Sequence, residues 1–183
     1  YMGERPYNPE LLSEEGIFFD RIPAGKIRRY FSIKNITDSI KTLSGILQVL
    51  WKFTLNPPDV IFSKGGYDAF PTLVIARLYR IPTIIHESDS VPGKVNEWSA
   101  KFAAKIGISF PEAMKHFPAE KTALVGNPIR RAVIGGSETE AFEMFVLETG
   151  IPTILVLGGS QGAQTINDAI IEALPELVAE AQV

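Results

Sequence analysis

The sequence predicts an α/β protein whose sheet strands run parallel. Apolar segments of strand length alternate along the chain with segments of helical periodicity, which is the order of a parallel sheet with crossover helices. Several strand segments are continuous apolar runs, as expected for strands that are covered on both faces. The expected strands are 16–22, 59–63, 83–87, 105–110, 122–125 and 153–157, and the expected helices are 36–55, 71–80, 94–104, 111–116, 138–149 and 163–181.

The composition narrows the function classes. With 45% apolar and 21% charged residues, the 183-residue chain has the balance of a soluble globular protein. It has no cysteine, which excludes disulfides and thiolate metal sites, and its 2 histidines leave little for a histidine-based site, so no bound metal is expected. No apolar run reaches the roughly 18 residues that a membrane span needs.

Charge divides the chain into two parts. Residues 1–131 carry all 18 basic residues and 13 acidic ones, whereas residues 132–183 carry eight acidic residues and no basic residue. This asymmetry suggests two units with different partners. Near the break, Ser137 and Glu140 have the spacing of a capping box that opens a new helix. We therefore predict one domain over 1–133 and the start of a second over 134–183.

The expected helix 36–55 follows a basic segment. Residues 21–34 hold five basic residues and one aromatic pair. The helix places Ile36, Ile40, Leu43, Leu47, Leu50 and Trp51 on one face, which Ile46, Val49 and Phe53 widen, and we expect most of this face to be core. An apolar excess beside basic residues is also typical of proteins that rest on an anionic membrane surface. Nucleic-acid binding is the weaker alternative, because the chain is acidic and the basic cluster is short.

Glycines follow the expected strand 59–63. Gly65 and Gly66 precede Tyr67 and a helix with Pro71 in its first turn. Two glycines let a backbone approach a ligand closely, and a helix N-terminus offers free N–H groups to an anion. The alternative is a tight strand-to-helix turn without a ligand.

Polar side chains follow the next strand. His86 and Glu87 end the segment 83–87, and Asp89 and Asn96 come shortly after. Ligands of parallel α/β sheets bind beyond the carboxyl ends of the strands, where these four groups converge. This pattern favours a functional site over four unrelated polar residues, although a lone buried histidine is more often part of the core.

Two motifs lie near the predicted domain boundary and beyond it. Arg130 ends the stretch VGNPIR, where it either contacts phosphate oxygens or is an ordinary surface arginine. The glycine-rich turn 158–162 follows an apolar run and precedes a helix. It does not match the dinucleotide fingerprint, but it suits a diphosphate held by backbone N–H groups and a serine hydroxyl.

Taken together, five stretches resemble the bacterial glycosyltransferases that form lipid II. The stretches are DVIFSKGGYDAFP, IPTIIHESDSVPGKVNEWSAKFA, SFPEA, VGNPIR and LVLGGSQGAQTIND. Members of this family are UDP-N-acetylglucosamine–N-acetylmuramyl-(pentapeptide) pyrophosphoryl-undecaprenol N-acetylglucosaminyltransferases. The resemblance implies a glycosyltransferase B fold, with two Rossmann-like domains that are both incomplete here. It also implies inverting transfer of GlcNAc from UDP-GlcNAc to the muramoyl 4-hydroxyl of the undecaprenyl-linked acceptor.

The resemblance also assigns residues to substrates. It implies no cofactor and no metal, and it places the enzyme at the cytoplasmic face of the bacterial inner membrane as a peripheral protein. The implied donor-binding residues are Asp89, Arg130, Gly159, Ser160, Gln161 and Gly162. The implied acceptor-binding residues are Gly65, Gly66, Tyr67, His86, Glu87 and Asn96. The implied membrane contacts are Lys26, Arg28, Arg29, Tyr30 and Phe31.

Several family features have no counterpart in this sequence. The glycine-rich N-terminal loop that carries the proposed general base is one, so no catalytic residue is assigned. The part that reads uracil and ribose is another, and we expect the 183 residues to be an internal segment without activity of their own. Two alternatives are another nucleotide-sugar enzyme of the same fold and a non-catalytic module that binds a nucleotide sugar or docks on membranes.

Overall fold

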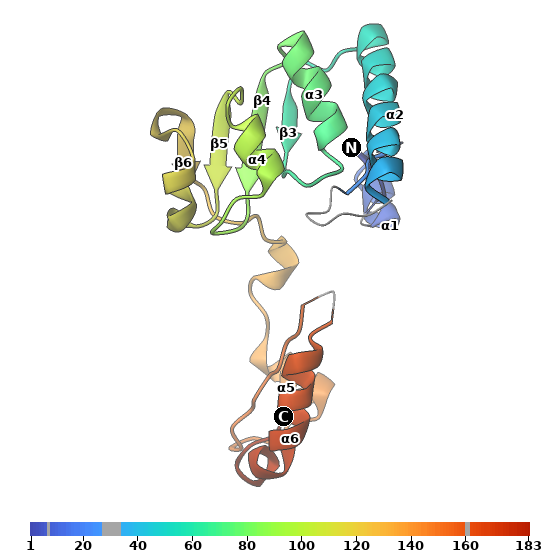
Figure 1. Ribbon diagram of the computed structural model, residues 1–183. Coiled ribbons are helices and arrows are strands. Elements are labelled where there is room, and N and C mark those ends of the chain that lie inside the picture. The colour runs from blue at the N-terminus through green and yellow to red at the C-terminus, as the bar shows by residue number, and fades with distance from the viewer. Residues whose placement is uncertain (7, 27–33, 160–161) are drawn as a thin grey trace. The chain divides into compact units, whose positions relative to one another are not determined.

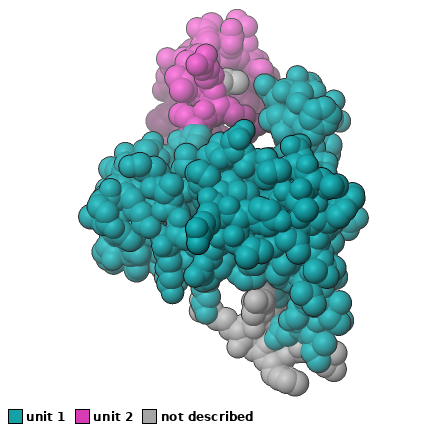
Figure 2. All heavy atoms as spheres, turned by 90° about the horizontal axis from the view of Figure 1, so that it is seen from above, with its two compact units in different colours: residues 1–128 teal, residues 129–183 magenta. Residues whose placement is uncertain are grey.

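The chain folds into two compact units, Tyr1–Pro128 and Ile129–Val183, coloured teal and magenta in Figure 2. The computed structural model describes residues 1–6, 8–26, 34–159 and 162–183. The predicted functional boundary at residues 133 and 134 stays a prediction.

A four-stranded parallel sheet forms the centre of the first unit. Its strands follow one another in the order β3-β4-β5-β6. The connecting helices α3 and α4 lie on one face of this sheet in Figure 1. The strands are β3 (Ile61–Ser63), β4 (Thr83–Glu87), β5 (Lys105–Ile108) and β6 (Thr122–Leu124), and the helices are α3 (Phe70–Tyr79) and α4 (Lys94–Ser99). These four strands were predicted, and β4 has the predicted bounds.

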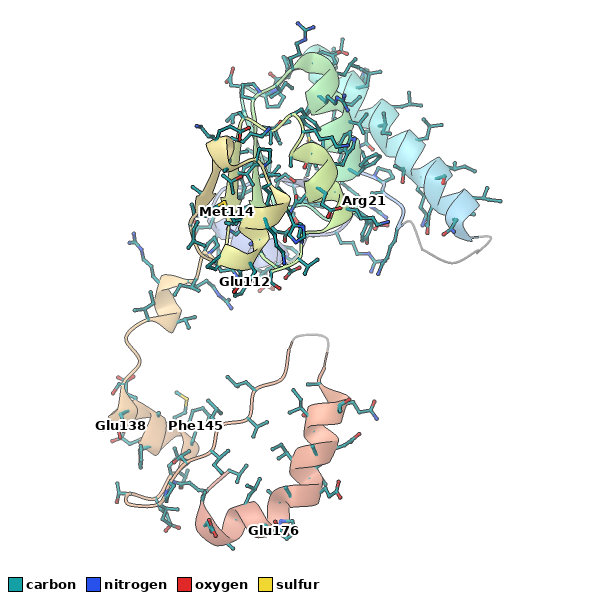
Figure 3. All side chains as sticks on the ribbon, turned by 60° about the vertical axis from the view of Figure 1, so that its left-hand side comes forward. Arg21, Glu112, Met114, Glu138, Phe145 and Glu176 are labelled. Carbon is teal, nitrogen blue, oxygen red and sulfur yellow. The ribbon has the colours of Figure 1, made fainter. Side chains whose placement is uncertain are left out.

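The connection from β5 to β6 contains two short 3₁₀ helices, η1 (Pro111–His116) and η2 (Ala119–Lys121). Met114 of η1, labelled in Figure 3, packs against a core cluster formed by β4, β5, α4 and η1. The buried members of this cluster are Ile85, Ala100, Ala103, Ile106, Ile108, Ala113 and Phe117. The cluster fixes the middle of the sheet, whose carboxyl ends carry the predicted polar residues.

A second, two-stranded parallel sheet belongs to the same unit. It pairs β1 (Met2–Gly3) with β2 (Asp20–Arg21), and α1 (Pro9–Glu14) connects them. The predicted strand 16–22 is therefore shorter, and β1 and α1 were not predicted. Among the described residues, β1 and β3 each have a partner strand on one side only. A cavity of about 580 Å³ is bordered by Tyr1 and Met2 on the β1 side and by residues 60–65 on the β3 side.

Helix α2 (Lys34–Leu55) lies beside α3 (Figure 1) and buries only one side of the predicted apolar face. Val49 is 0% exposed and Phe53 2% exposed, and both belong to the second core cluster. Five predicted core residues are 57–64% exposed instead: Ile36, Ile40, Leu43, Leu47 and Trp51. Leu50, the sixth, is only partly buried and packs on the cluster.

The reason is a close approach at Gly45. A side chain at Gly45 would collide with the carbonyl of Pro23, so the absence of one lets the chain around Ile22 lie directly on this face of α2. Figure 3 shows side chains projecting outward along the uncovered side of the helix. Within the described ranges, no helix is long and apolar enough to cross a membrane.

The second unit consists of η3 (Arg131–Val133), α5 (Glu138–Phe145) and α6 (Gln164–Glu180). The Ser137 side chain accepts a hydrogen bond from the Glu140 backbone N–H at 3.2 Å, as the capping box predicts. Glu138 and Phe145 mark the two ends of α5 in Figure 3. The helix stops before the predicted residue 149, because Val146 adopts the left-handed conformation with φ 54°.

The prediction of a strand over 153–157 is wrong. The segment forms a single bridge, between Thr153 and Gln182, and Leu155 and Leu157 are both 76% exposed. A strand needs a neighbouring strand to satisfy its backbone groups, and the described part of this unit supplies a partner at one position only.

Candidate functional site at the carboxyl ends of β3 and β4

The loop after β3 is a glycine turn. Gly65 and Gly66 have φ angles of 80° and 87°, a region that other residues rarely adopt. The Gly65 N–H donates to the Ser63 hydroxyl at 3.0 Å, which ties the turn to the end of β3. The chain then enters α3, with Pro71 in the first turn of the helix.

The loop after β4 is organised by Glu87. The side chain is 4% exposed, and its carboxylate accepts three hydrogen bonds. Oε1 accepts from the Asp89 backbone N–H at 3.0 Å, and Oε2 accepts from the Gly93 backbone N–H at 3.1 Å and from Asn96 Nδ2 at 2.9 Å. A carboxylate that accepts several N–H hydrogen bonds constrains the local backbone strongly, because charge-assisted hydrogen bonds are stronger than neutral ones. Glu87 therefore closes the segment 88–93 into a fixed loop.

Asn96 joins this loop to the glycine turn. Its side chain is 3% exposed, and Nδ2 also lies 3.3 Å from the carbonyl oxygen of His86. Among the described residues, Asn96 Oδ1 is the one buried side-chain polar atom without a hydrogen-bond partner. It faces Gly65 so closely that a Cβ at that position would lie 2.6 Å from it.

His86 connects β4 to the residues that follow β6. Its side chain is 4% exposed, and Nε2 lies 2.9 Å from the carbonyl oxygen of Gly126. A carbonyl only accepts, so Nε2 carries a proton and donates it to this oxygen, and the Ser88 hydroxyl lies 3.4 Å from Nδ1. Nearby, the Ser109 hydroxyl donates to Asn127 Oδ1 at 2.9 Å. Both ring nitrogens thus face groups of the protein itself.

Tyr67 closes the other side of the glycine turn. Its hydroxyl donates to Glu4 Oε2 at 3.0 Å, which links the turn to the residue after β1. Partial burial, and then the hydrogen bond and negative charge of Glu4, raise the pKa of the Tyr67 hydroxyl above its ordinary value. Tyr67 therefore keeps its proton at neutral pH and remains a donor.

The structure brings the predicted acceptor-side residues together. Gly65, His86, Glu87 and Asn96 lie at neighbouring ends of β3 and β4, while the Asp89 side chain is exposed. The predicted donor residues Arg130, Gly159 and Gly162 belong to the second unit, and Arg130 is exposed. Ser160 and Gln161 lie outside the described residues. So do Arg28, Arg29, Tyr30 and Phe31, whereas Lys26 is described and exposed.

Three participants were not anticipated from the sequence. Ser63 accepts from the glycine turn, Gly93 donates to Glu87, and Gly126 accepts from His86. Two of these participants, Gly93 and Gly126, contribute backbone atoms, which residue identity does not reveal. For Gly93, the dipeptide Pro92-Gly93 is a turn signal that could have placed it in a loop, but it does not reveal the partner.

Comparison with known proteins decides the family. Residues 1–108 match the profile described as the glycosyltransferase family 28 N-terminal domain. The chain belongs to glycosyltransferase family 28. The matched range thus includes every residue of the loops after β3 and β4.

Curated relatives of this family 28 chain carry one name. Proteins of Bacillus cereus and Clostridium botulinum are 39% and 35% identical to it over 94% and 93% of its length. Both are named UDP-N-acetylglucosamine–N-acetylmuramyl-(pentapeptide) pyrophosphoryl-undecaprenol N-acetylglucosamine transferase. The chain spans about half the length of the curated relatives it matches, 49% and 48% respectively.

The solved structure of Acinetobacter baumannii MurG is also similar. It matches with a TM-score of 0.60 and 27% identity, over 96% of this chain and 46% of MurG. This match and the parallel sheets confirm the predicted α/β fold of glycosyltransferase B type. The curated relatives confirm the resemblance to the lipid II-forming family.

Proposed function

We propose that the complete protein containing this chain transfers GlcNAc from UDP-GlcNAc to undecaprenyl-diphospho-muramoyl-pentapeptide, converting lipid I to lipid II in peptidoglycan synthesis. The observation that carries the proposal is 39% identity, over 94% of the chain, to a transferase named for these substrates. The polar groups at the ends of β3 and β4 support it, because they lie within the matched residues and at the edge of the sheet where α/β proteins bind ligands.

In this proposal the acceptor muramoyl 4-hydroxyl attacks the anomeric carbon of GlcNAc, the configuration inverts, and UDP leaves. The loops after β3 and β4 form the acceptor side, with Asp89 toward the donor. Negative charge develops on the leaving diphosphate. Backbone N–H groups of the turn 158–162, the Ser160 hydroxyl and the Arg130 guanidinium would stabilise that charge without a metal ion.

The test is transfer of labelled GlcNAc to a lipid I analogue by the full-length protein. We expect product from the full-length protein and none from the 183-residue chain. In the full-length protein, Arg130→Ala and Ser160→Ala should lower kcat/KM for UDP-GlcNAc about tenfold or more, as removal of a charge-assisted hydrogen bond in the transition state does. A full-length protein that makes no product would refute the proposal, and unchanged donor kinetics in both variants would remove these two roles.

We also propose that the protein rests on the cytoplasmic membrane surface through α2. In the sequence, α2 directly follows a segment with five basic residues between 21 and 34. The exposed apolar face of the helix consists of Ile36, Ile40, Leu43, Leu47 and Trp51. An apolar face penetrates the headgroup region while basic residues attract anionic lipids. The pairing of these two features on one end of the chain favours a membrane over a protein partner.

Vesicle sedimentation tests this contact. We expect the chain to bind phosphatidylglycerol vesicles and not phosphatidylcholine vesicles, and salt to weaken the binding. The double variant Ile40→Ser/Leu43→Ser should bind at least about tenfold more weakly. The control is Leu78→Ser, which removes a leucine that is 65% exposed on α3, outside this face. Equal losses in the variant and in the control would argue against docking through α2.

A further inference from the structure

The loops after β3 and β4 are linked through one buried side-chain pair, Glu87 and Asn96. Glu87 holds the loop 88–93 by accepting from the N–H groups of Asp89 and Gly93. Glu87 Oε2 also accepts from Asn96 Nδ2 at 2.9 Å. Both oxygens of the carboxylate are therefore engaged within the protein, and the side chain is 4% exposed.

The same hydrogen bonds determine which way the Asn96 amide points. Nδ2 lies between two acceptors, the Glu87 carboxylate and the His86 carbonyl. A flipped amide would place its oxygen against both of them, so the observed orientation is the one that these acceptors allow. Oδ1 consequently faces Gly65, where only a glycine leaves room for it. The orientation of Glu87 is thus transmitted through Asn96 to the turn after β3.

We propose that Glu87 is a positioning residue that sets the two loops as one preformed wall of the acceptor site. It acts through the loop backbone and through Asn96, and it does not contact the acceptor. This inference rests on the proposed transferase function for its kinetic consequence. Its structural consequence, the rigidity of both loops, is independent of that function.

The test uses the full-length protein with Glu87→Gln. This change keeps the shape of the side chain, but it replaces one carboxylate oxygen with an NH₂ group. That group cannot accept the one or two N–H hydrogen bonds that the oxygen accepted. We expect the amides of Asp89 and Gly93 to exchange hydrogen at least about tenfold faster, as loss of a hydrogen bond of about 1.4 kcal/mol predicts. The KM for the lipid-linked acceptor should rise about tenfold or more, with less than about a twofold change in the KM for UDP-GlcNAc.

The matched control is Glu97→Gln. Glu97 is an exposed carboxylate in the first turn of α4, one residue from Asn96. Glu97→Gln removes one negative charge from the same part of the sequence as Glu87→Gln does. We expect it to change neither the hydrogen exchange of the loop after β4 nor the kinetics of transfer. Asn96→Ala should reproduce the acceptor effect, and the double variant with Glu87→Gln should lose less than the product of the two single effects, because both act in one linkage.

The outcomes separate the inference from the function it rests on. A full-length wild-type protein that transfers no sugar refutes the function, while the exchange rates of the Asp89 and Gly93 amides still decide the positioning. Unchanged exchange in Glu87→Gln, or a fall in kcat without a change in exchange, overturns the positioning role. If Glu87→Gln does not fold, Asn96→Ala carries the test, because unchanged exchange at Gly65 and Gly66 in that variant contradicts the linkage.

Discussion

Substituting three glycines with alanine separates two contributions to the free energy of unfolding: the strain of a left-handed backbone and the collision of an added methyl group with its neighbours. Gly65 combines a φ of 80° with a Cβ position 2.6 Å from Asn96 Oδ1. Gly126 has a φ of 74° but open space where its Cβ would be. Gly93 has a φ of −71° and the same open space, so it carries neither cost.

The magnitudes follow from these geometries. Gly93→Ala should change the free energy of unfolding by less than about 0.5 kcal/mol, since any residue adopts its conformation and the new methyl group meets nothing. Gly126→Ala should cost about 1–2 kcal/mol for the left-handed backbone. Gly65→Ala should cost the same amount plus about 1–3 kcal/mol for the collision with Asn96, or about 2–5 kcal/mol in total.

Urea unfolding followed by tryptophan fluorescence measures these differences in the unit of the chain that contains the three glycines. The chain has 2 tryptophans, Trp51 and Trp98, and both belong to the unit Tyr1–Pro128. Midpoints compared at a constant slope give the differences in free energy of unfolding. If Gly65→Ala costs no more than Gly126→Ala, then Asn96 yields to the added methyl group, and the rigid contact inferred here between the two loops does not exist.

Three further predictions test other parts of the structure. The pKa of Tyr67 is raised, first by burial and then by Glu4, so the folded state holds this proton more tightly than the unfolded chain. The stability that wild type has over Tyr67→Phe should therefore be full at neutral pH and disappear as the pH rises above the ordinary value of 10.0, as measured by urea unfolding across that range. Phe53→Ala should cost about 3–5 kcal/mol and Leu47→Ala less than about 1 kcal/mol in the same assay, and the reverse order would mean that the Leu47 side of the apolar face of α2, rather than the Phe53 side, is buried. Gln182→Ala removes the side-chain acceptor of the Glu148 N–H, so this amide should exchange at least about tenfold faster, and an unchanged rate would show that Gln182 does not hold the second unit together.

The sheet could be predicted from the sequence where local signals agree. Residues 83–87 place two β-branched isoleucines between Pro82 and a polar loop, and the strand has the predicted bounds. Helix α2 was predicted within two residues of its start, but most of its wide apolar face is exposed rather than buried. Packing at Gly45 determines that the side with Val49 and Phe53 is the buried one.

The candidate site was predictable in its location but not in its connections. The polar residues after β4 converge because parallel strands end at one edge. However, the partners of Glu87 include two backbone N–H groups of its own loop, and the partner of His86 is a backbone carbonyl forty residues away. Such contacts depend on the path of the chain, which the identities of the side chains do not specify.

The cavity between β1 and β3 has a consequence for how this chain behaves at high concentration. Two strand edges without a second partner border it, and each offers a line of backbone donors and acceptors to any extended segment that meets it. In a crowded solution the nearest such segment belongs to another copy of the chain. Pairing of these edges between copies would appear as light scattering that increases with the concentration of the 183-residue chain.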